Sequence, residues 1–78
     1  MVTAFILAKV ESGKDEEVLK RVRKLKGVQH ASPTYGVYDL HVEVSFENMD
    51  ELDKFIFNEI RRLPGINETL TLVAFKGM

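Results

Sequence analysis

The first strand of the chain is predicted by a nearly unbroken run of apolar residues. Between Val2 and Val10 only two positions are polar, so both faces of the strand are apolar and we expect it at the centre of a sheet. The next segment, residues 15–25, places apolar side chains at helical spacing, namely Val18, Leu19, Val22 and Leu25. Gly27 follows and provides the stop for this predicted helix.

A second strand and a hairpin turn are predicted next. Residues 28–35 include Pro33, which cannot donate a hydrogen bond to a neighbouring strand, so we expect this strand at a sheet edge. Gly36 and Val37 form a tight turn, since glycine readily takes the positive φ that such turns require. A third strand follows the turn and continues to Phe46, with apolar residues alternating with polar ones.

The second helix begins with an N-cap signal and is followed by a last strand. Asn48 and Glu51 have the spacing of a capping box. We expect this helix to bury one apolar stripe, which consists of Leu52, Phe55, Ile56, Ile60 and Leu63. A Pro-Gly pair ends the helix, and the last strand covers residues 66–75. Phe57 falls off the stripe, so this large aromatic side chain has no evident place in the core of one subunit.

The two halves of the chain resemble each other at an offset of 38 residues. In the strands, Val2, Ala4, Ile6 and Ala8 fall on Leu40, Val42, Val44 and Phe46. In the helical parts, Val18, Val22, Leu25, Gly27 and Val28 fall on Ile56, Ile60, Leu63, Gly65 and Ile66. Two strand-helix-strand halves interlock as a four-stranded antiparallel sheet with both helices on one face. The predicted fold is therefore the α+β, ferredoxin-like βαββαβ plait, with the first and third strands central.

The alternation also predicts which residues lie on the sheet face without helices, which we call the helix-free face. Phe5 and Leu7 would lie there with three titratable residues of the third strand, Asp39, His41 and Glu43. On the last strand, Leu70, Leu72 and Ala74 are expected on the helix side, and Thr69, Thr71, Val73 and Phe75 on the helix-free face. An apolar patch of this kind predicts sheet-against-sheet dimerisation. The expected interface contains Phe5, Leu7, His41, Val73 and Phe75.

The second strand contains a conflict between two patterns. The repeat makes Val28 a core residue, whereas pairing across the turn puts Ala31 and Tyr35 on the helix side, which is the other parity. A β-bulge near Pro33 would reconcile the two patterns.

Composition limits the classes of function. With 78 residues, 45% of them hydrophobic and 29% charged, the chain is typical of one soluble globular domain covering residues 1–78. It has no cysteine, which excludes thiol catalysis and disulfides. Neither a membrane-length apolar run nor a secretory signal is present, so we expect a cytoplasmic protein that does not associate with membranes. The net charge of -1 argues against direct nucleic-acid binding.

Two histidines and a glutamate form the only set that could be drawn as a metal site. Glu43 would lie opposite His30 across the hairpin, and His41 diagonal to it. Histidines on neighbouring strands are common without a metal, and no third histidine or supporting acid is evident, so we predict neither metal nor other cofactor. An acid–base role for His41 beside Asp39 lacks an identifiable nucleophile.

A second group of polar residues suits a free amino acid as ligand. The group comprises Tyr35, Gly36, Tyr38 and Asp39 around the predicted turn and Thr69 and Thr71 on one strand face. A carboxylate accepts hydrogen bonds from an ammonium group, while hydroxyls and the N–H groups of a turn can hold a carboxylate. The alternative is that Gly36 only makes the turn, Asp39 caps it, and the threonines are ordinary strand formers.

Three motifs occur in an order that is shared with a known family. The first strand contains V-x-A, and a glycine precedes the first helix. Residues 35–40, YGVYDL, match the pattern Gly-x-Tyr-Asp-Leu, and residues 63–71, LPGINETLT, match a helix-end Pro-Gly-Val followed by Thr-x-Thr. Together they resemble the RAM domain, the ligand-binding domain of the Lrp/AsnC transcriptional regulators, over nearly the whole chain.

The resemblance implies a ferredoxin-like plait that dimerises through its sheets and assembles into octamers or decamers, with amino acids bound between dimers. Gly36, Tyr38 and Asp39 would lie near this effector with the Thr-x-Thr strand, and Phe57 would contact a second dimer. The chain begins directly at the first strand, without a helix-turn-helix domain. It therefore resembles a stand-alone RAM protein that does not bind DNA directly, regulates amino-acid metabolism or transcription, and has a full-length Lrp/AsnC-type regulator as a partner.

Two other interpretations of the same plait stay open. A small dimeric α/β-barrel enzyme, of monooxygenase or isomerase type, would use His41 or His30 as its base. An ACT-type regulatory module shares the strand order but usually pairs side by side, which a first strand with two apolar faces disfavours.

Overall fold

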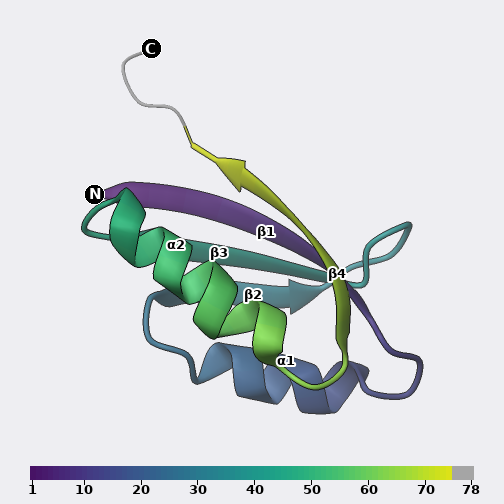
Figure 1. The fold of residues 1–78 in the computed structure, drawn as a ribbon. Helices are drawn as coiled ribbons and strands as arrows, with labels where there is room; N and C mark the ends of the chain where they lie inside the picture. The colour runs from purple at the N-terminus through teal and green to yellow at the C-terminus, as the bar shows by residue number, and fades with distance from the viewer. Residues whose placement is uncertain (75–78) are drawn as a thin grey trace.

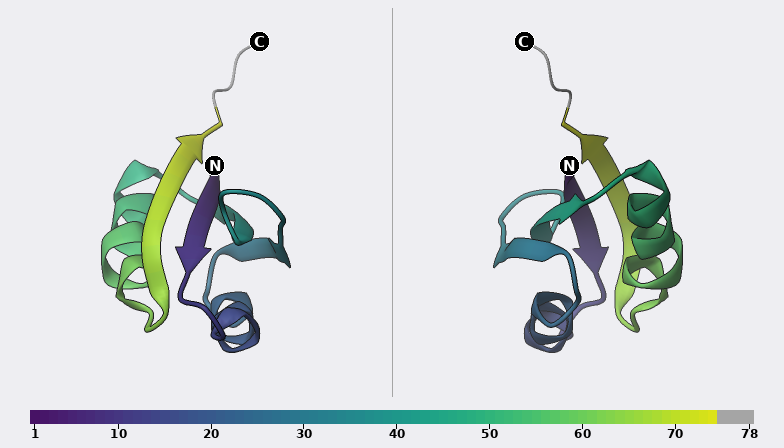
Figure 2. Two further views of the ribbon diagram at one scale, coloured as in Figure 1. Left: turned by 90° about the vertical axis from the view of Figure 1, so that its right-hand side faces the viewer. Right: turned by 90° about the vertical axis from the view of Figure 1, so that its left-hand side faces the viewer.

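The computed structural model describes residues 1–74 and has the predicted order of strands and helices (Figure 1). The elements are β1 (Val2–Val10), α1 (Asp15–Arg23), β2 (Val28–Pro33), β3 (Leu40–Phe46), α2 (Met49–Asn58), the 3-10 turn η1 (Ile60–Arg62) and β4 (Ile66–Val73). The strands form one antiparallel sheet in the order β2-β3-β1-β4. The ferredoxin-like prediction is confirmed, including the central positions of β1 and β3. In the views of Figure 2, α2 lies next to β4 and α1 lies on the β2 side of the twisted sheet.

Several boundaries differ from the sequence prediction. β2 ends at Pro33 and β3 begins at Leu40, so a loop of residues 34–39 replaces the predicted two-residue turn. One further backbone hydrogen bond, from the N–H of Thr34 to the carbonyl of Asp39 at 3.0 Å, follows the last strand pair before the chain enters the loop. The second helical segment is an α-helix to Asn58, and the separate turn η1 then carries Ile60 into the core.

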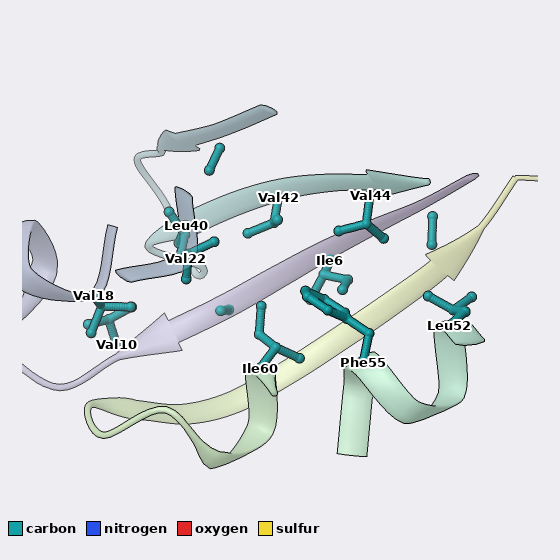
Figure 3. Close-up of a cluster of buried hydrophobic side chains, with 13 residues drawn as sticks. Ile6, Val10, Val18, Val22, Leu40, Val42, Val44, Leu52, Phe55 and Ile60 are labelled. Atoms are coloured by element: carbon teal, nitrogen blue, oxygen red, sulfur yellow. The ribbon is translucent and has the colours of Figure 1, made fainter. Parts of the chain in front are cut away.

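The core lies between the helices and one face of the sheet, with side chains from β1, β3 and both helical segments pointing toward one another (Figure 3). As predicted, alternate residues of the central strands face the helices and are at most 2% exposed, namely Ala4, Ile6, Ala8, Leu40, Val42 and Val44. The helical segments contribute Val18, Val22, Leu52, Phe55 and Ile60. Ile56 and Leu63, which were expected inside, are only partly buried at the border of this core.

The repeat is visible in the glycines that follow the two helical segments. Gly27 and Gly65, which are equivalent at the 38-residue offset, have φ values of 98° and 100°. A Cβ atom at Gly27 would overlap the ring of Phe46, and one at Gly65 would lie 2.8 Å from Val18 Cγ2. Both positions therefore need glycine for its backbone freedom and for its small size.

A β-bulge resolves the conflict between the two patterns in β2. Val28 pairs with Val44, whereas His30 pairs with Glu43, so Gln29 is the extra residue. The predicted bulge exists, but it lies at the start of the strand rather than near the proline. Because of this extra residue, the alternation shifts by one position, and Ala31 faces the helices as the pairing across the turn had predicted.

The equivalent bulge on β4 reverses the predicted faces of that strand. Lys9 pairs with Glu68 and Val10 with Ile66, so Asn67 is the extra residue. Residues directly opposite each other share a face. On the helix side Thr69, Thr71 and Val73 lie opposite Ala8, Ile6 and Ala4, and on the helix-free face Leu70 and Leu72 lie opposite Leu7 and Phe5. The prediction that the two threonines and Val73 lie on the helix-free face is therefore wrong, because the bulge shifts the alternation by one residue. Phe75 lies outside the described residues.

Candidate functional site

The loop of residues 34–39 projects from the end of the sheet (Figure 1). The hydroxyl of Thr34 donates to the carbonyl of Tyr38 at 2.8 Å and closes the loop at its base. Gly36 at the tip has a φ of 109°, a conformation that glycine adopts without strain. The side chain of Tyr35 is fully exposed, not directed toward the helices as the strand pattern had predicted. The tip is thus accessible to another molecule.

Asp39 fastens the end of this loop to β1. Its Oδ2 accepts a hydrogen bond from the N–H of Val10 at 2.8 Å, and its own N–H donates to the carbonyl of Ala8 at 2.9 Å. One carboxylate oxygen of Asp39 therefore has a structural role that the sequence did not reveal. Among residues 1–74 the structure gives the other oxygen, Oδ1, no hydrogen-bond partner, so it remains available to an ammonium group.

We expect Asp39→Ala to lower stability as well as ligand affinity. The substitution leaves the mostly buried Val10 N–H without its acceptor, which should reduce the free energy of unfolding by about 1–2 kcal/mol. Urea denaturation would measure the loss, with Asp53→Ala as the control because Asp53 is exposed on α2. Equal stabilities for the two variants would show that the Asp39–Val10 hydrogen bond contributes nothing.

Lys9 links the loop to β4 on the helix-free face. Its Nζ lies 5.7 Å from the centroid of the Tyr38 ring and 3.8 Å from Oε1 of Glu68. Both charged side chains are well exposed, so the ion pair adds little stability. The ion pair does, however, hold the Glu68 carboxylate near Lys9.

Thr69 and Thr71 line an open cavity of about 440 Å³ on the helix side of β4. The complete lining consists of Ile56, Arg61, Ile66, Asn67, Glu68, Thr69 and Thr71. None of the loop residues 34–39 belongs to it, and β1 lies between the two groups, because Ala8 pairs with Leu40 on one side and Thr69 on the other. The two parts of the predicted amino-acid site are therefore separated within one chain.

The helix-free face is apolar over β1 and β4. Phe5 and Leu7 lie there as predicted, and they are joined by Leu70 and Leu72, which are 42% and 53% exposed. Sequence alternation had placed these two leucines on the helix side. The conflict of patterns in β2 was the available signal, because the repeat places an equivalent bulge in β4. Four large apolar side chains on one open face form a patch of the kind that proteins bury against a partner.

The same face is polar over β2 and β3. His30 lies opposite Glu43, and Ser32 lies opposite His41. The Nε2 atom of His30 is 2.8 Å from the hydroxyl of Ser32, and the ring of His41 stacks against Phe5 with 6.1 Å between centroids. Within the described residues, no group of three or more histidine, cysteine, aspartate or glutamate side chains is arranged to hold a metal ion. The two histidines thus have neighbours that suit packing and hydrogen bonding at an interface.

A larger cavity of about 750 Å³ lies over the rings of Phe46 and Phe55, beside α2. Its rim carries side chains of both charges, namely Lys26, Lys54, Glu47, Glu51 and Glu59. Such mixed charge selects neither an anion nor a cation. No motif in the sequence indicated this hollow, and none of the predicted ligand-binding residues lines it.

Comparisons with known proteins identify the family of this chain. The family model for the Lrp/AsnC ligand binding domain matches residues 3–78. The HTH-type transcriptional regulator FL11 of Pyrococcus abyssi is 36% identical over 94% of this chain and 48% of its own length. The chain thus spans about half the length of the curated relatives it matches. These relatives are transcriptional regulators and not enzymes, in agreement with the non-enzymatic prediction, and the α/β-barrel enzyme is set aside.

Two solved structures match over most of both chains. The crystal structure of FFRP-DM1 has a TM-score of 0.93 and 41% identity, over 96% of this chain and 100% of that one. A hypothetical protein from Pyrococcus horikoshii, PHS023, has a TM-score of 0.92 and 40% identity, over 99% of this chain and 93% of that one. In residues 1–74 no helix is both long and apolar enough to cross a membrane. The chain belongs to the Lrp/AsnC ligand binding domain family.

Proposed function

We propose that this chain is a RAM-like domain, residues 1–78, that binds a free amino acid and regulates transcription or amino-acid metabolism as a homo-oligomer. The observation that carries this proposal is the cavity beside Thr69 and Thr71, which opens to solvent in a fold whose family is defined by ligand binding. Both threonines line a hollow that is large enough for a small metabolite. The site therefore has the polar groups and the space that an amino acid requires.

Two copies of the chain would complete the site. In one chain the loop with Tyr35, Gly36, Tyr38 and Asp39 is separated by β1 from the threonine cavity. In this proposal the loop of one copy contributes to the cavity of another, where its N–H groups would hold the carboxylate of the ligand and the Asp39 carboxylate would accept from its ammonium group. Ligand binding and assembly would then stabilise each other, since each provides groups that the other needs.

Self-association through the helix-free face is the second part of the proposal. The interface would contain Phe5, Leu7, His41, Leu70 and Leu72, because these residues share the face in the observed register. Val73 is removed from the expected interface because it lies opposite Ala4 on the helix side. Burying the four apolar side chains removes their surface from water and leaves the polar residues over β2 and β3 to set the orientation.

The downstream partner in this proposal is a longer regulator of the same family. The curated relatives contain about as much sequence outside the matched region as within it. A shared ligand-binding fold would allow this chain to join their assemblies in the cytoplasm and change their amino-acid response without itself contacting DNA. Its near-neutral charge is consistent with that indirect role.

Calorimetry with each of the twenty amino acids tests the binding proposal. We expect at least one amino acid to bind, and Thr69→Val and Thr71→Val to weaken binding because each removes a hydroxyl with little change in shape. Thr3→Val is the matched control, since the Thr3 hydroxyl lies 3.3 Å from that of Ser45 between β1 and β3, away from the cavity. Absence of binding by all twenty amino acids at millimolar concentration would overturn the proposal.

A further inference from the structure

Arg61 is held over an exposed aromatic ring beside the threonine cavity. Its guanidinium carbon lies 5.2 Å from the centroid of the Phe57 ring, four residues earlier in the chain. Phe57 is 58% exposed and takes no part in the core. A flat guanidinium stacks on an aromatic face, which restricts the side chain while leaving the edges of the group free to donate hydrogen bonds. The ring of Phe57, unexplained by the sequence pattern, thus supports Arg61.

The positive charge of Arg61 has no acidic partner among residues 1–74. The ion pairs of this part of the chain join Lys9 to Glu68 and Arg21 to Glu17. Glu68 also contributes to the cavity lining, but it is paired in register with Lys9 and its carboxylate is drawn to that residue on the helix-free face. Besides this paired carboxylate, the polar side chains of the cavity lining are one guanidinium, two hydroxyls and the amide of Asn67.

We infer that Arg61 provides the counter-charge for a carboxylate in the ligand's side chain, so that the domain selects acidic amino acids. This inference rests on the proposed function. Every amino acid carries the same α-ammonium and α-carboxylate, which the loop of residues 34–39 is suited to hold, so those groups give no selectivity. Selectivity must arise where the side chain lies. A guanidinium binds a carboxylate through two parallel hydrogen bonds, and the threonine hydroxyls can donate further ones.

The chemistry of the cavity separates acidic ligands from their close analogues. An amide ligand has the shape of the acid but lacks its charge, so it forms weaker hydrogen bonds with a guanidinium. A basic ligand would bring a second positive charge close to the Arg61 guanidinium. We therefore expect glutamate or aspartate to bind roughly tenfold or more tightly than glutamine or asparagine, and lysine to bind least well.

Calorimetry of the full chain with L-glutamate, L-aspartate, L-glutamine, L-asparagine and L-lysine tests this inference. Arg61→Gln should abolish the preference for acids over amides, because it weakens acid binding more than amide binding. Arg62→Gln is the matched control, because it removes the same charge from the next residue, which does not line the cavity. Phe57→Leu should reduce the preference only partly, since it removes the supporting ring and leaves the charge.

The outcomes separate the inference from the proposed function. If no amino acid binds, both fall together. If amides or lysine bind as tightly as acids, or if Arg61→Gln keeps the preference, the inference is wrong while the proposed function stands. The wild-type protein gives an independent check that does not depend on a variant folding. Added salt should weaken acid binding more than amide binding because it screens the guanidinium, and an equal effect on both would contradict the inference.

Discussion

Replacing Leu72 with glutamate should convert the proposed dimer into single chains that keep their fold. Leu72 is 53% exposed in one chain and lies opposite Phe5 on the helix-free face. In a two-fold interface one substitution places two carboxylates in the buried region. The cost of removing each from water is several kcal/mol, so the dissociation constant should rise roughly a thousandfold or more. Sedimentation or light scattering would measure the change in mass.

Val73→Glu is the matched control for this experiment. Val73 is the next residue on the same strand and is 46% exposed, but it lies opposite Ala4 on the helix side. It should therefore leave the mass unchanged, with circular dichroism confirming that both variants are folded. If Val73→Glu dissociates the protein and Leu72→Glu does not, the interface uses the other face of β4.

Gly27→Ala should cause a large loss of stability although it adds only one methyl group. Gly27 has a φ of 98°, and its Cβ would overlap the ring of Phe46, which packs against Phe55 with 5.1 Å between centroids. Backbone strain of about 1–3 kcal/mol adds to an overpacking cost of similar size. We therefore expect the free energy of unfolding to fall by about 4 kcal/mol, a large share of the ~5–15 kcal/mol of a typical domain.

Gly13→Ala separates the two causes of this loss. Gly13 has a φ of 84°, but nothing lies within 4 Å of its added Cβ. This variant should lose only the strain energy, about 1–2 kcal/mol. Urea denaturation at one protein concentration would compare the two, because the proposed self-association would make stability depend on concentration. Equal losses would mean that the contact with Phe46 contributes nothing.

The fold was predictable because several local signals agree. The 38-residue repeat, the apolar run in β1 and the Asn48 cap all indicate the same plait, and the side chain of Asn48 indeed accepts a hydrogen bond from the N–H of Glu51 at 3.0 Å. Agreement between levels of structure is what makes a sequence specify one fold. The core positions of the central strands followed from the same alternation.

The faces of β4 were not predictable from alternation alone. A bulge at Asn67 adds one residue to the strand without changing its apolar pattern, so counting in steps of two from Ile66 gives the wrong face. In β2 two sequence patterns disagree, which indicates the bulge, whereas within β4 itself no second pattern contradicts the alternation. The repeat itself could have transferred the bulge from Gln29 to Asn67, which is equivalent at the 38-residue offset.

The candidate site was only partly predictable for a different reason. Motifs identified the loop residues and the threonines, but neither motif specifies the distance between them, and one chain leaves β1 between the two groups. Arg61 was not predictable as a site residue, because its role depends on three structural features that the sequence does not show. These are its stacking on Phe57, its place in the cavity wall and the lack of an acidic partner within the described residues.

Light scattering on the wild-type protein tests most directly the claim that the helix-free face is covered by another copy. One chain has a mass of 8.9 kDa. We predict at least twice that mass down to micromolar concentration, because four large apolar side chains share one open face. A protein that keeps the mass of one chain at high concentration, with this face in water, would contradict the account.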